Sequence, residues 1–172
     1  DGTCPAGTKV WDLLVDGDIA QPHTAHEVVD TAVRRFGGVD LLVNNAGIFI
    51  SKPFTDYTTE DFDRLVSTNL AGFFYVTQHA VRQMRRVRSG HIVNISAAAV
   101  ISNYAGFSIY GATKWALEGV SESLAAELKP LGIKVTIVQP GPFRTDFIGR
   151  SLERARTHIA DYDRTSGKFL RF

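Results

Sequence analysis

The sequence predicts an α/β fold in which helices cover a doubly wound, mostly parallel sheet, giving three layers. Short apolar runs of strand length alternate along the chain with longer segments whose apolar residues recur at helical spacing. The later strand candidates are apolar throughout, which is typical of parallel strands buried on both faces. We therefore expect a single domain over residues 1–172, a length that can bury a substantial core.

The individual elements follow from this pattern in chain order. Strand-length apolar runs occur at residues 9–19, 39–45, 90–96 and 133–140. Helical spacing predicts helices at residues 24–36, from about 59 to 88, from about 109 to 129, and at 150–162. Gly37 follows the first helix, a capping box at residues 58–61 opens the second, and Pro130 follows the third. These residues support the helix ends that the apolar spacing suggests.

Charge and hydropathy argue against nucleic-acid and membrane partners. The net charge is +1, which gives no strong attraction to nucleic acid or to an anionic lipid surface. Four arginines fall near the end of a predicted helix, where they suit the helix dipole and solvent: Arg82, Arg85, Arg86 and Arg88. No apolar run approaches the ~18 residues that a membrane-spanning helix needs.

Cysteine and histidine usage points to a reducing compartment and to no metal. Cys4 is the only cysteine, so no internal disulfide can form and we expect a cytoplasmic location. His23 and His26 are close in sequence, but no further cysteine or histidine joins them as a third ligand. We therefore expect no metal site.

Small residues follow three of the predicted strands. These turns are residues 44–47 (NNAG), 96–98 (SAA) and 140–142 (PGP). The carboxyl ends of parallel strands meet at one edge of a sheet, where ligands of such folds bind. Glycine and small residues let a flat ligand approach the backbone closely. This edge is therefore the predicted ligand site.

Tyr110 and Lys114 begin the helix that follows the 90–96 strand. A spacing of four residues puts both side chains on one helix face. An ammonium beside a phenol favours the phenolate, and moving the phenol pKa from about 10 to near neutral takes roughly 4 kcal/mol. A tyrosine tuned in this way is a candidate general acid/base. The alternative is a half-buried aromatic beside an exposed helix lysine, since this spacing alone is common.

The motifs taken together resemble the short-chain dehydrogenase/reductase family over nearly the whole chain. The resemblance rests on NNAG at residues 44–47, on Asn69 in a pattern like N-L-x-G-x-F, on Y-x-x-x-K at Tyr110 and Lys114, and on P-G-x-x-x-T at residues 140–145. It implies a Rossmann-like fold, NAD or NADP as cofactor, and hydride transfer between that cofactor and the alcohol or carbonyl group of a small-molecule substrate.

The resemblance also implies roles for single residues. Tyr110 would exchange a proton with the substrate oxygen, and Lys114 would bind the nicotinamide ribose and lower the tyrosine pKa. Asn69 would hold a water that links the lysine to solvent, the alternative being a core asparagine satisfied by backbone groups. Further cofactor contacts fall, by the same resemblance, on Asp18, Ile19, Asn45, Ala46, Gly47, Pro140, Gly141 and Thr145.

One catalytic position departs from the family pattern. The family carries a serine thirteen residues before the tyrosine, and this chain has Ala97 there. Ser96 is adjacent, but neighbouring side chains of an extended segment point to opposite faces, so Ser96 replaces it only if the backbone turns. Ser102 and Ser108 are further candidates on the loop before Tyr110. Losing one such donor typically costs ~10²–10³ in rate.

The glycine-rich turn that holds the pyrophosphate in the family, T-G-x-x-x-G-x-G, has no match in this chain. We expect that the chain begins just before the family's third strand, that two β-α units, or ~60 residues, are absent, and that it stops before the last strand. The domain would then be incomplete, with a bare edge on the 39–45 strand unless the 9–16 segment moves across to cover it. We expect this polypeptide alone to bind no NAD(P) and to be inactive.

Two functions remain open from the sequence. Intact Asn69, Tyr110 and Lys114 favour an NAD(P)-dependent oxidoreductase. Ala97 and the missing glycine turn favour a non-catalytic fragment, or a binding or oligomerisation module of the same fold. The helices at 59–88 and 109–129 match those with which the family forms dimers and tetramers, and they carry apolar residues beyond one core stripe. We therefore expect a homo-oligomer in the full-length parent.

Overall fold

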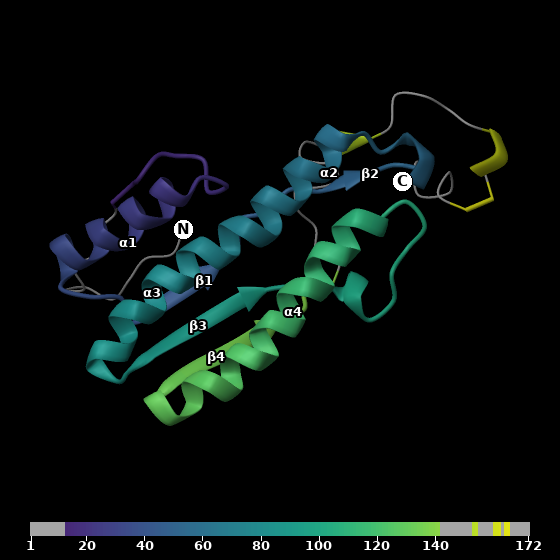
Figure 1. The fold of residues 1–172 in the computed structure, drawn as a ribbon. Coiled ribbons are helices and arrows are strands. Elements are labelled where there is room, and N and C mark those ends of the chain that lie inside the picture. The colour runs from purple at the N-terminus through teal and green to yellow at the C-terminus, as the bar shows by residue number, and fades with distance from the viewer. Residues whose placement is uncertain (1–12, 142–152, 155–159, 163, 166–172) are drawn as a thin grey trace, which may run out of the picture.

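The computed structural model describes residues 13–141, 153–154, 160–162 and 164–165. Its main sheet has three parallel strands in the order β1-β3-β4, with bounds β1 (Leu41–Asn44), β3 (Gly90–Ile95) and β4 (Ile133–Val138) (Figure 1). A second, two-stranded sheet pairs β2 (Ile50–Ser51) in parallel with β5 (Glu153–Arg154). The strands expected within 39–45, 90–96 and 133–140 are thus confirmed, and so is the parallel α/β architecture.

Four α-helices accompany the sheets: α1 (Pro22–Phe36), α2 (Thr59–Val66), α3 (Phe73–Val87) and α4 (Ser108–Leu128). The segment expected as one helix from 59 to 88 is helical throughout, but its middle turn, Ser67–Gly72, is π-helical. Short 3-10 turns occur at Phe54–Asp56, Ala98–Val100, Lys129–Leu131 and Ala160–Tyr162. No helix in the described part of the chain is long and apolar enough to cross a membrane.

The helices of the main sheet cover one of its faces. Leu42, Ile92 and Val135 lie in register across the three strands and pack with Met84 of α3 and Leu128 of α4. Helix α1 packs beside α3 on the same side (Figure 1). Within the described ranges the structure therefore shows two layers, and the second helical layer of the expected three is not among them.

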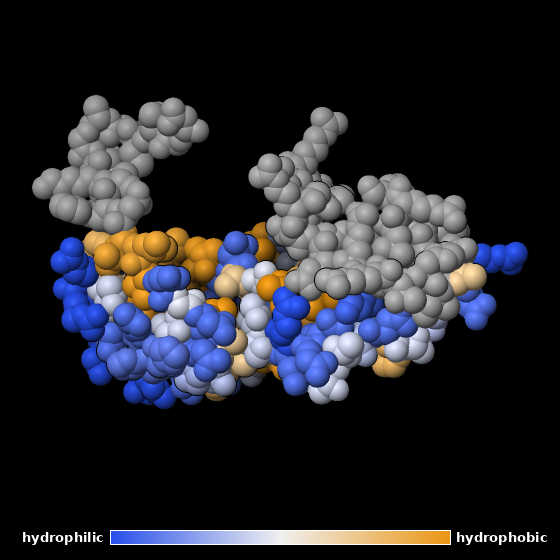
Figure 2. Space-filling model, turned by 90° about the horizontal axis from the view of Figure 1, so that it is seen from above, coloured by the Kyte–Doolittle hydropathy of each residue, from blue (hydrophilic) through white to orange (hydrophobic). Residues whose placement is uncertain are grey.

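The opposite face of the sheet is open. Leu41 is 56% exposed and Val43 is 51% exposed, although both are strand residues. Figure 2 shows apolar side chains gathered along the side of the molecule away from the helices. Strand β1 is also an edge strand, since no other described segment pairs with its outer side. The bare edge expected on this strand is therefore present.

Two predicted elements are wrong where the structure describes them. Residues 13–19 form no strand but an irregular segment with a turn, in which the Gln21 amide donates to the Asp18 carbonyl at 3.0 Å. An apolar run needs a partner strand to become one, and this segment has none. Of the expected 150–162 helix, Glu153–Arg154 instead form β5, whose backbone pairs with β2, and Ala160–Tyr162 form a 3-10 turn, while residues 150–152 and 155–159 lie outside the described part. Residues 9–12 lie outside the described part.

A chain of polar side chains crosses the core. Asn44 of β1 donates to Thr77 of α3 at 2.9 Å and to Asn94 of β3 at 2.8 Å. Asn94 in turn donates to Ser121 of α4 at 2.8 Å, and Ser121 donates to the Leu117 carbonyl at 2.6 Å. Because each buried polar group has a partner, the network adds specificity without leaving an unsatisfied donor. It fixes both flanking helices against the two strands that lead into the ligand edge.

The predicted capping box at the start of α2 is present and extends into an ion pair. Thr58 accepts from the Asp61 amide at 3.2 Å, and Asp61 accepts from the Thr58 amide at 3.0 Å. The same carboxylate accepts from Lys52 Nζ at 2.5 Å. Burial alone would raise the pKa of Asp61, but the hydrogen bond from Lys52 and that from the Thr58 amide outweigh it, so the pKa lies below its ordinary value of 3.8.

Asp61→Asn is expected to lower the free energy of unfolding at pH 7 by about 2 kcal/mol, because it removes charge-assisted bonds and leaves Lys52 without its carboxylate. A lowered folded-state pKa contributes stability above the unfolded pKa, which is lost as the pH falls through the folded value. The difference between wild type and variant should therefore shrink from pH 7 to pH 3. Urea unfolding at both pH values measures it, with the exposed Asp63→Asn as matched control. An equal loss at both pH values would contradict the prediction.

Candidate functional site

The residues that follow the three parallel strands meet at one edge of the main sheet, as the sequence predicted. The turn of residues 45–47 follows β1 and is exposed, Ser96 and Ala97 follow β3, and Pro140 and Gly141 follow β4. The Ser96 amide donates to Val138 at 2.8 Å, and the Ala98 amide donates to Pro140 at 3.0 Å. Backbone bonding of this kind continues the parallel register past the strand ends and holds the turns side by side.

Helix α4 brings Tyr110 and Lys114 to this edge. The Tyr110 ring makes edge contacts with Phe49 and Phe107, at centroid distances of 4.6 Å and 6.4 Å. Lys114 is 6% exposed, and its Nζ lies 5.9 Å from the centre of the Tyr110 ring. The same Nζ donates to the Ile95 carbonyl at 2.8 Å. The i, i+4 spacing has therefore put both side chains on the buried side of α4, and Lys114 is not the exposed lysine of the alternative.

Burial dominates the titration of both groups. Burial raises the pKa of Tyr110, and burial lowers the pKa of Lys114. Both directions disfavour the charged form, as expected for groups taken out of water. The lowering of the tyrosine pKa by Lys114, expected with a cofactor in the site, stays a prediction.

Asn69 lies in the π-helical turn and is 1% exposed. Its Oδ1 accepts from the Ile48 amide at 2.8 Å, and its Nδ2 donates to the Ile48 carbonyl at 3.0 Å and to Thr113 at 3.2 Å. Thr113 donates in turn to the Tyr110 carbonyl at 2.7 Å. The side chain therefore matches the alternative of a core asparagine satisfied mainly by backbone, and it joins the segment after Gly47 to α4. Single π-turns of this kind are frequent at functional sites.

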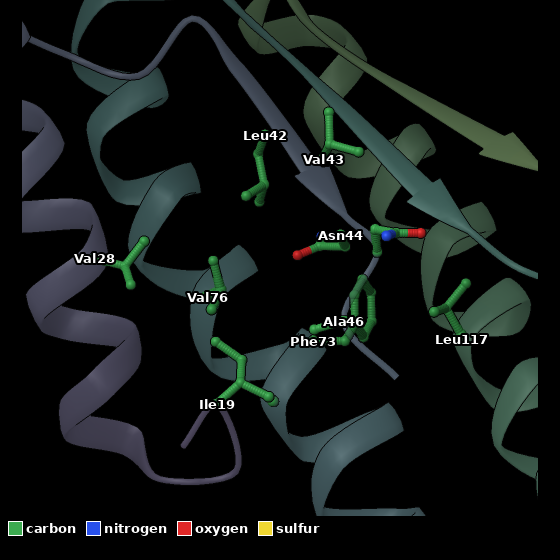
Figure 3. A pocket seen from close by; sticks show the side chains of 11 residues that line it. Ile19, Val28, Leu42, Val43, Asn44, Ala46, Phe73, Val76 and Leu117 are labelled. Carbon is green, nitrogen blue, oxygen red and sulfur yellow. The ribbon is translucent and has the colours of Figure 1, made fainter. Parts of the chain in front are cut away.

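A pocket of about 170 Å³ opens beside the carboxyl end of β1 (Figure 3). Its walls are mostly apolar and include Ile19, Ala46, Phe73 and Leu117, and Asn45 also lines it. Ile19 packs closely on Gly72, since a Cβ added to Gly72 would lie 3.0 Å from atoms of Ile19. The pocket is thus a small, mostly apolar space beside the exposed turn of residues 45–47.

The other predicted cofactor residues that the structure describes do not line this pocket. A Cβ on Gly47 would lie 3.3 Å from Asn69 Oδ1 and 3.8 Å from Lys114 Nζ, so the glycine lets the chain pass close to both side chains. Gly141 has open space at its Cβ position. Asp18 is exposed and accepts from the Ala20 amide at 3.0 Å, which is a turn role. Thr145 lies outside the described residues.

The hydroxyl that the family pattern requires has no clear replacement here. Ala97 packs against the same aromatic cluster as Tyr110. Ser96 is 3% exposed, and its hydroxyl donates to the Glu118 carboxylate of α4. Ser108 Oγ is closed off from solvent, whereas Ser102 is exposed on the loop. The Ser96 hydroxyl is therefore already hydrogen-bonded to α4.

Three site residues were missed in the sequence: Thr113, Glu118 and Gln139. Gln139 Nε2 donates to both carboxylate oxygens of Glu118 at 2.9 and 3.0 Å. Glu118 lies four residues after Lys114 on the helix, so helical spacing could have identified it. Gln139 carries no such pattern, because its contact depends on how β4 lies against α4.

The described histidines of α1 and α3 lie away from this edge. No group of three or more potential His, Cys, Asp or Glu ligands occurs among the residues that the structure describes. His26 contacts Asp30 at 3.2 Å and stacks edge-on with His79 at 5.2 Å. His26 therefore has partners within the surface where α1 meets α3.

Comparisons with known proteins agree with this geometry. The family model for the short chain dehydrogenase matches residues 6–155. An oxidoreductase of Botryotinia fuckeliana, BOA17, is 34% identical over 152 residues, which cover 88% of this chain and 55% of that protein. The chain thus spans about half the length of the curated relatives that it matches.

Solved structures show the same fold. A short-chain dehydrogenase from Streptomyces avermitilis aligns with a TM-score of 0.84 at 36% identity, over 91% of this chain and 58% of that one. ElxO with NADP bound aligns with a TM-score of 0.74 at 34% identity, over 77% and 54% of the two chains. An NAD⁺-bound xylitol dehydrogenase aligns with a TM-score of 0.71 at 34% identity, over 76% and 51%. With its parallel sheet, its Tyr110–Lys114 helix and these matches, the chain belongs to the short-chain dehydrogenase family.

Proposed function

We propose that the protein containing this chain is an NAD(P)-dependent oxidoreductase that interconverts an alcohol and a carbonyl group on a small-molecule substrate. The observation that carries this proposal is the joint position of Tyr110 and Lys114. Both lie on the buried side of α4, at the sheet edge that also carries the pocket beside Asn45 and Ala46. Family membership supports the same reaction type.

NAD or NADP is the proposed cofactor, and it supplies or accepts the hydride when bound. Two structural neighbours, ElxO and a xylitol dehydrogenase, have NADP and NAD⁺ bound. In this chain the apolar wall with Ile19 and Ala46 would take the adenine side. The open backbone at Gly47 and Gly141 would let the rest pass along the sheet edge toward Lys114. These features support a dinucleotide, not a metal, as the group held here.

Tyr110 acts as the acid in carbonyl reduction. Because burial raises the pKa of Tyr110, the phenol is protonated at neutral pH and holds the proton that the substrate oxygen must receive. The phenolate that forms is stabilised by the Lys114 ammonium, which lies against the same ring. Phe49 and Phe107 exclude water from one side of the phenol. Thr113 and Asn69 fix the helix turn on which Tyr110 sits.

The second candidate is a non-catalytic binding module of the same fold. Ala97 favours it, because an alanine methyl cannot donate the hydrogen bond that a serine there would give to the substrate oxygen. The commitment of Ser96 to Glu118 favours it as well. The two functions are separated by whether the Tyr110 hydroxyl matters for turnover.

Tyr110→Phe is expected to remove nearly all turnover and to leave cofactor affinity largely intact, because the ring stays and only the hydroxyl goes. The longest natural polypeptide that contains this chain is assayed with NADH and NADPH against a panel of aldehydes and ketones, and cofactor affinity is measured by calorimetry. Tyr104→Phe, on the exposed loop nearby, serves as control. Retention of more than about a tenth of the activity, or under 1.4 kcal/mol of barrier, would rule out Tyr110 as the acid.

Ala97→Ser is expected to raise turnover by up to ~10², because it restores a hydroxyl donor near the substrate oxygen. The increase should appear mainly in kcat, since the added bond strengthens as charge develops on that oxygen. Ala98→Ser, one residue further along the same segment, is the matched control. If Ala97→Ser leaves kcat unchanged on the same substrates, the missing hydroxyl does not limit the rate.

We further propose a homo-oligomer built on the helices. Large apolar side chains are exposed on α2, α3 and α4: Phe62 at 48%, Phe74 at 49% and Trp115 at 59%. Light scattering at micromolar concentration should give the mass of a dimer or tetramer, and Trp115→Glu should reduce that mass. Ile101→Glu, which alters a loop residue that is even more exposed, should not. A wild-type protein of monomer mass would contradict this assembly.

A further inference from the structure

Glu118 is a half-buried carboxylate that contacts the ends of two strands. It lies one helical turn after Lys114 and two turns after Tyr110 on α4. The Ser96 hydroxyl, at the end of β3, donates to its Oε1. Gln139, at the end of β4, donates to Oε1 at 2.9 Å and to Oε2 at 3.0 Å. These donors are neutral, and Ser96 is almost fully buried, so the charge is held by directed hydrogen bonds.

Helix α4 thus holds the end of β3 at two consecutive residues. Lys114 donates to the Ile95 carbonyl at 2.8 Å, and Glu118 accepts from the Ser96 hydroxyl. The Ser96 amide in turn donates to the Val138 carbonyl of β4 at 2.8 Å. The two contacts lie one turn apart on the helix and one residue apart on the strand, so together they set the register of α4 on the sheet edge.

We propose that Glu118 is a positioning residue that fixes the register of α4 on the ends of β3 and β4, and with it the place of Lys114 for the cofactor. The inference rests on the proposed function, which gives Lys114 a second partner. The ammonium has three N–H donors, so Lys114 can keep its bond to Ile95 and also donate to a ribose hydroxyl, provided that α4 keeps this register on β3. Ser121 also joins α4 to β3, through Asn94, whereas Glu118 contacts the ends of both β3 and β4.

The site needs such a contact because catalysis tolerates only a small displacement of the reacting groups. A misplacement of about 1 Å can cost ~10² in rate, and Tyr110 moves with α4. Thr113 joins α4 to Asn69 on the side of the helix near residue 48. That contact does not reach β3 or β4. Ser96 therefore has a role different from that of a substrate-binding serine: its hydroxyl serves the helix.

The test compares Glu118→Ala and Ser96→Ala, singly and together, in the longest natural polypeptide that contains this chain. Two quantities are measured: the thermal midpoint without cofactor, and the calorimetric affinity for NADH and NADPH. We expect Glu118→Ala to weaken cofactor affinity about tenfold, while the cofactor-free midpoint falls little because Lys114 still holds Ile95. The double variant should be no weaker than Glu118→Ala alone, because the two side chains form one contact.

Two further variants sharpen the result. Glu118→Gln keeps a carbonyl oxygen for Ser96, and the Gln139 amide can turn to match it, so affinity should stay within about threefold of wild type. Glu122→Ala removes an exposed glutamate one turn later on the same helix and should change neither quantity. If Glu118→Ala does not fold, the affinity of Ser96→Ala carries the test.

Three outcomes would overturn the inference. Unchanged affinity in both Glu118→Ala and Ser96→Ala, with wild type binding normally, would show that the contact does not position Lys114. A midpoint that falls equally with and without cofactor would show a purely structural contact. A wild-type protein that binds neither NADH nor NADPH would overturn the proposed function and this inference with it, which distinguishes the two failures.

Discussion

The in-register parallel pairing of β1, β3 and β4 is the constraint on which the rest of the structure depends. Because all three strands run in one direction, their following turns meet at a single edge. Leu42, Ile92 and Val135 face the helices from matching positions, so a shift of one residue would turn them to the open face. The polar chain from Asn44 through Asn94 makes such a shift costlier, since it would leave buried amides without partners. The register thus fixes the core and the site together.

Much of this arrangement could be predicted because it is local in sequence. Apolar runs identify the strands, the capping box identifies the start of α2, and a spacing of four residues puts Tyr110 and Lys114 on one face. The β2–β5 pairing could not be predicted, because strands of two residues have no pattern and their partners lie about a hundred residues apart. The open sheet face was missed for a related reason, since apolar strand residues indicate burial without showing what covers them.

The pKa of Tyr110 shows the same limit of prediction from sequence. Sequence spacing puts an ammonium near Tyr110, which on its own would lower the phenol pKa. Phe49, which comes from a distant segment, and Phe107 pack against the phenol, and burial raises its pKa. Lys114 donates to the Ile95 carbonyl. The pair is therefore a protonated phenol beside a lysine held by backbone, an arrangement that suits the acid role proposed for Tyr110.

The contacts along α4 also show how one face of this helix can both bring side chains to the candidate site and hold the helix on the sheet. Three side chains, each one turn after the last, make different contacts. Tyr110 packs in the aromatic cluster, Lys114 bonds the backbone of β3, and Glu118 joins the ends of β3 and β4. Ser121 joins the same helix to β3 through Asn94. The Glu118 carboxylate adds a contact to both strand ends that does not involve Lys114, so it can hold the helix in register independently of that lysine. Ala97 agrees with this arrangement, since the hydroxyl at the end of β3 belongs to Ser96 and bonds the helix, while Ala97 packs against the same aromatic cluster as Tyr110.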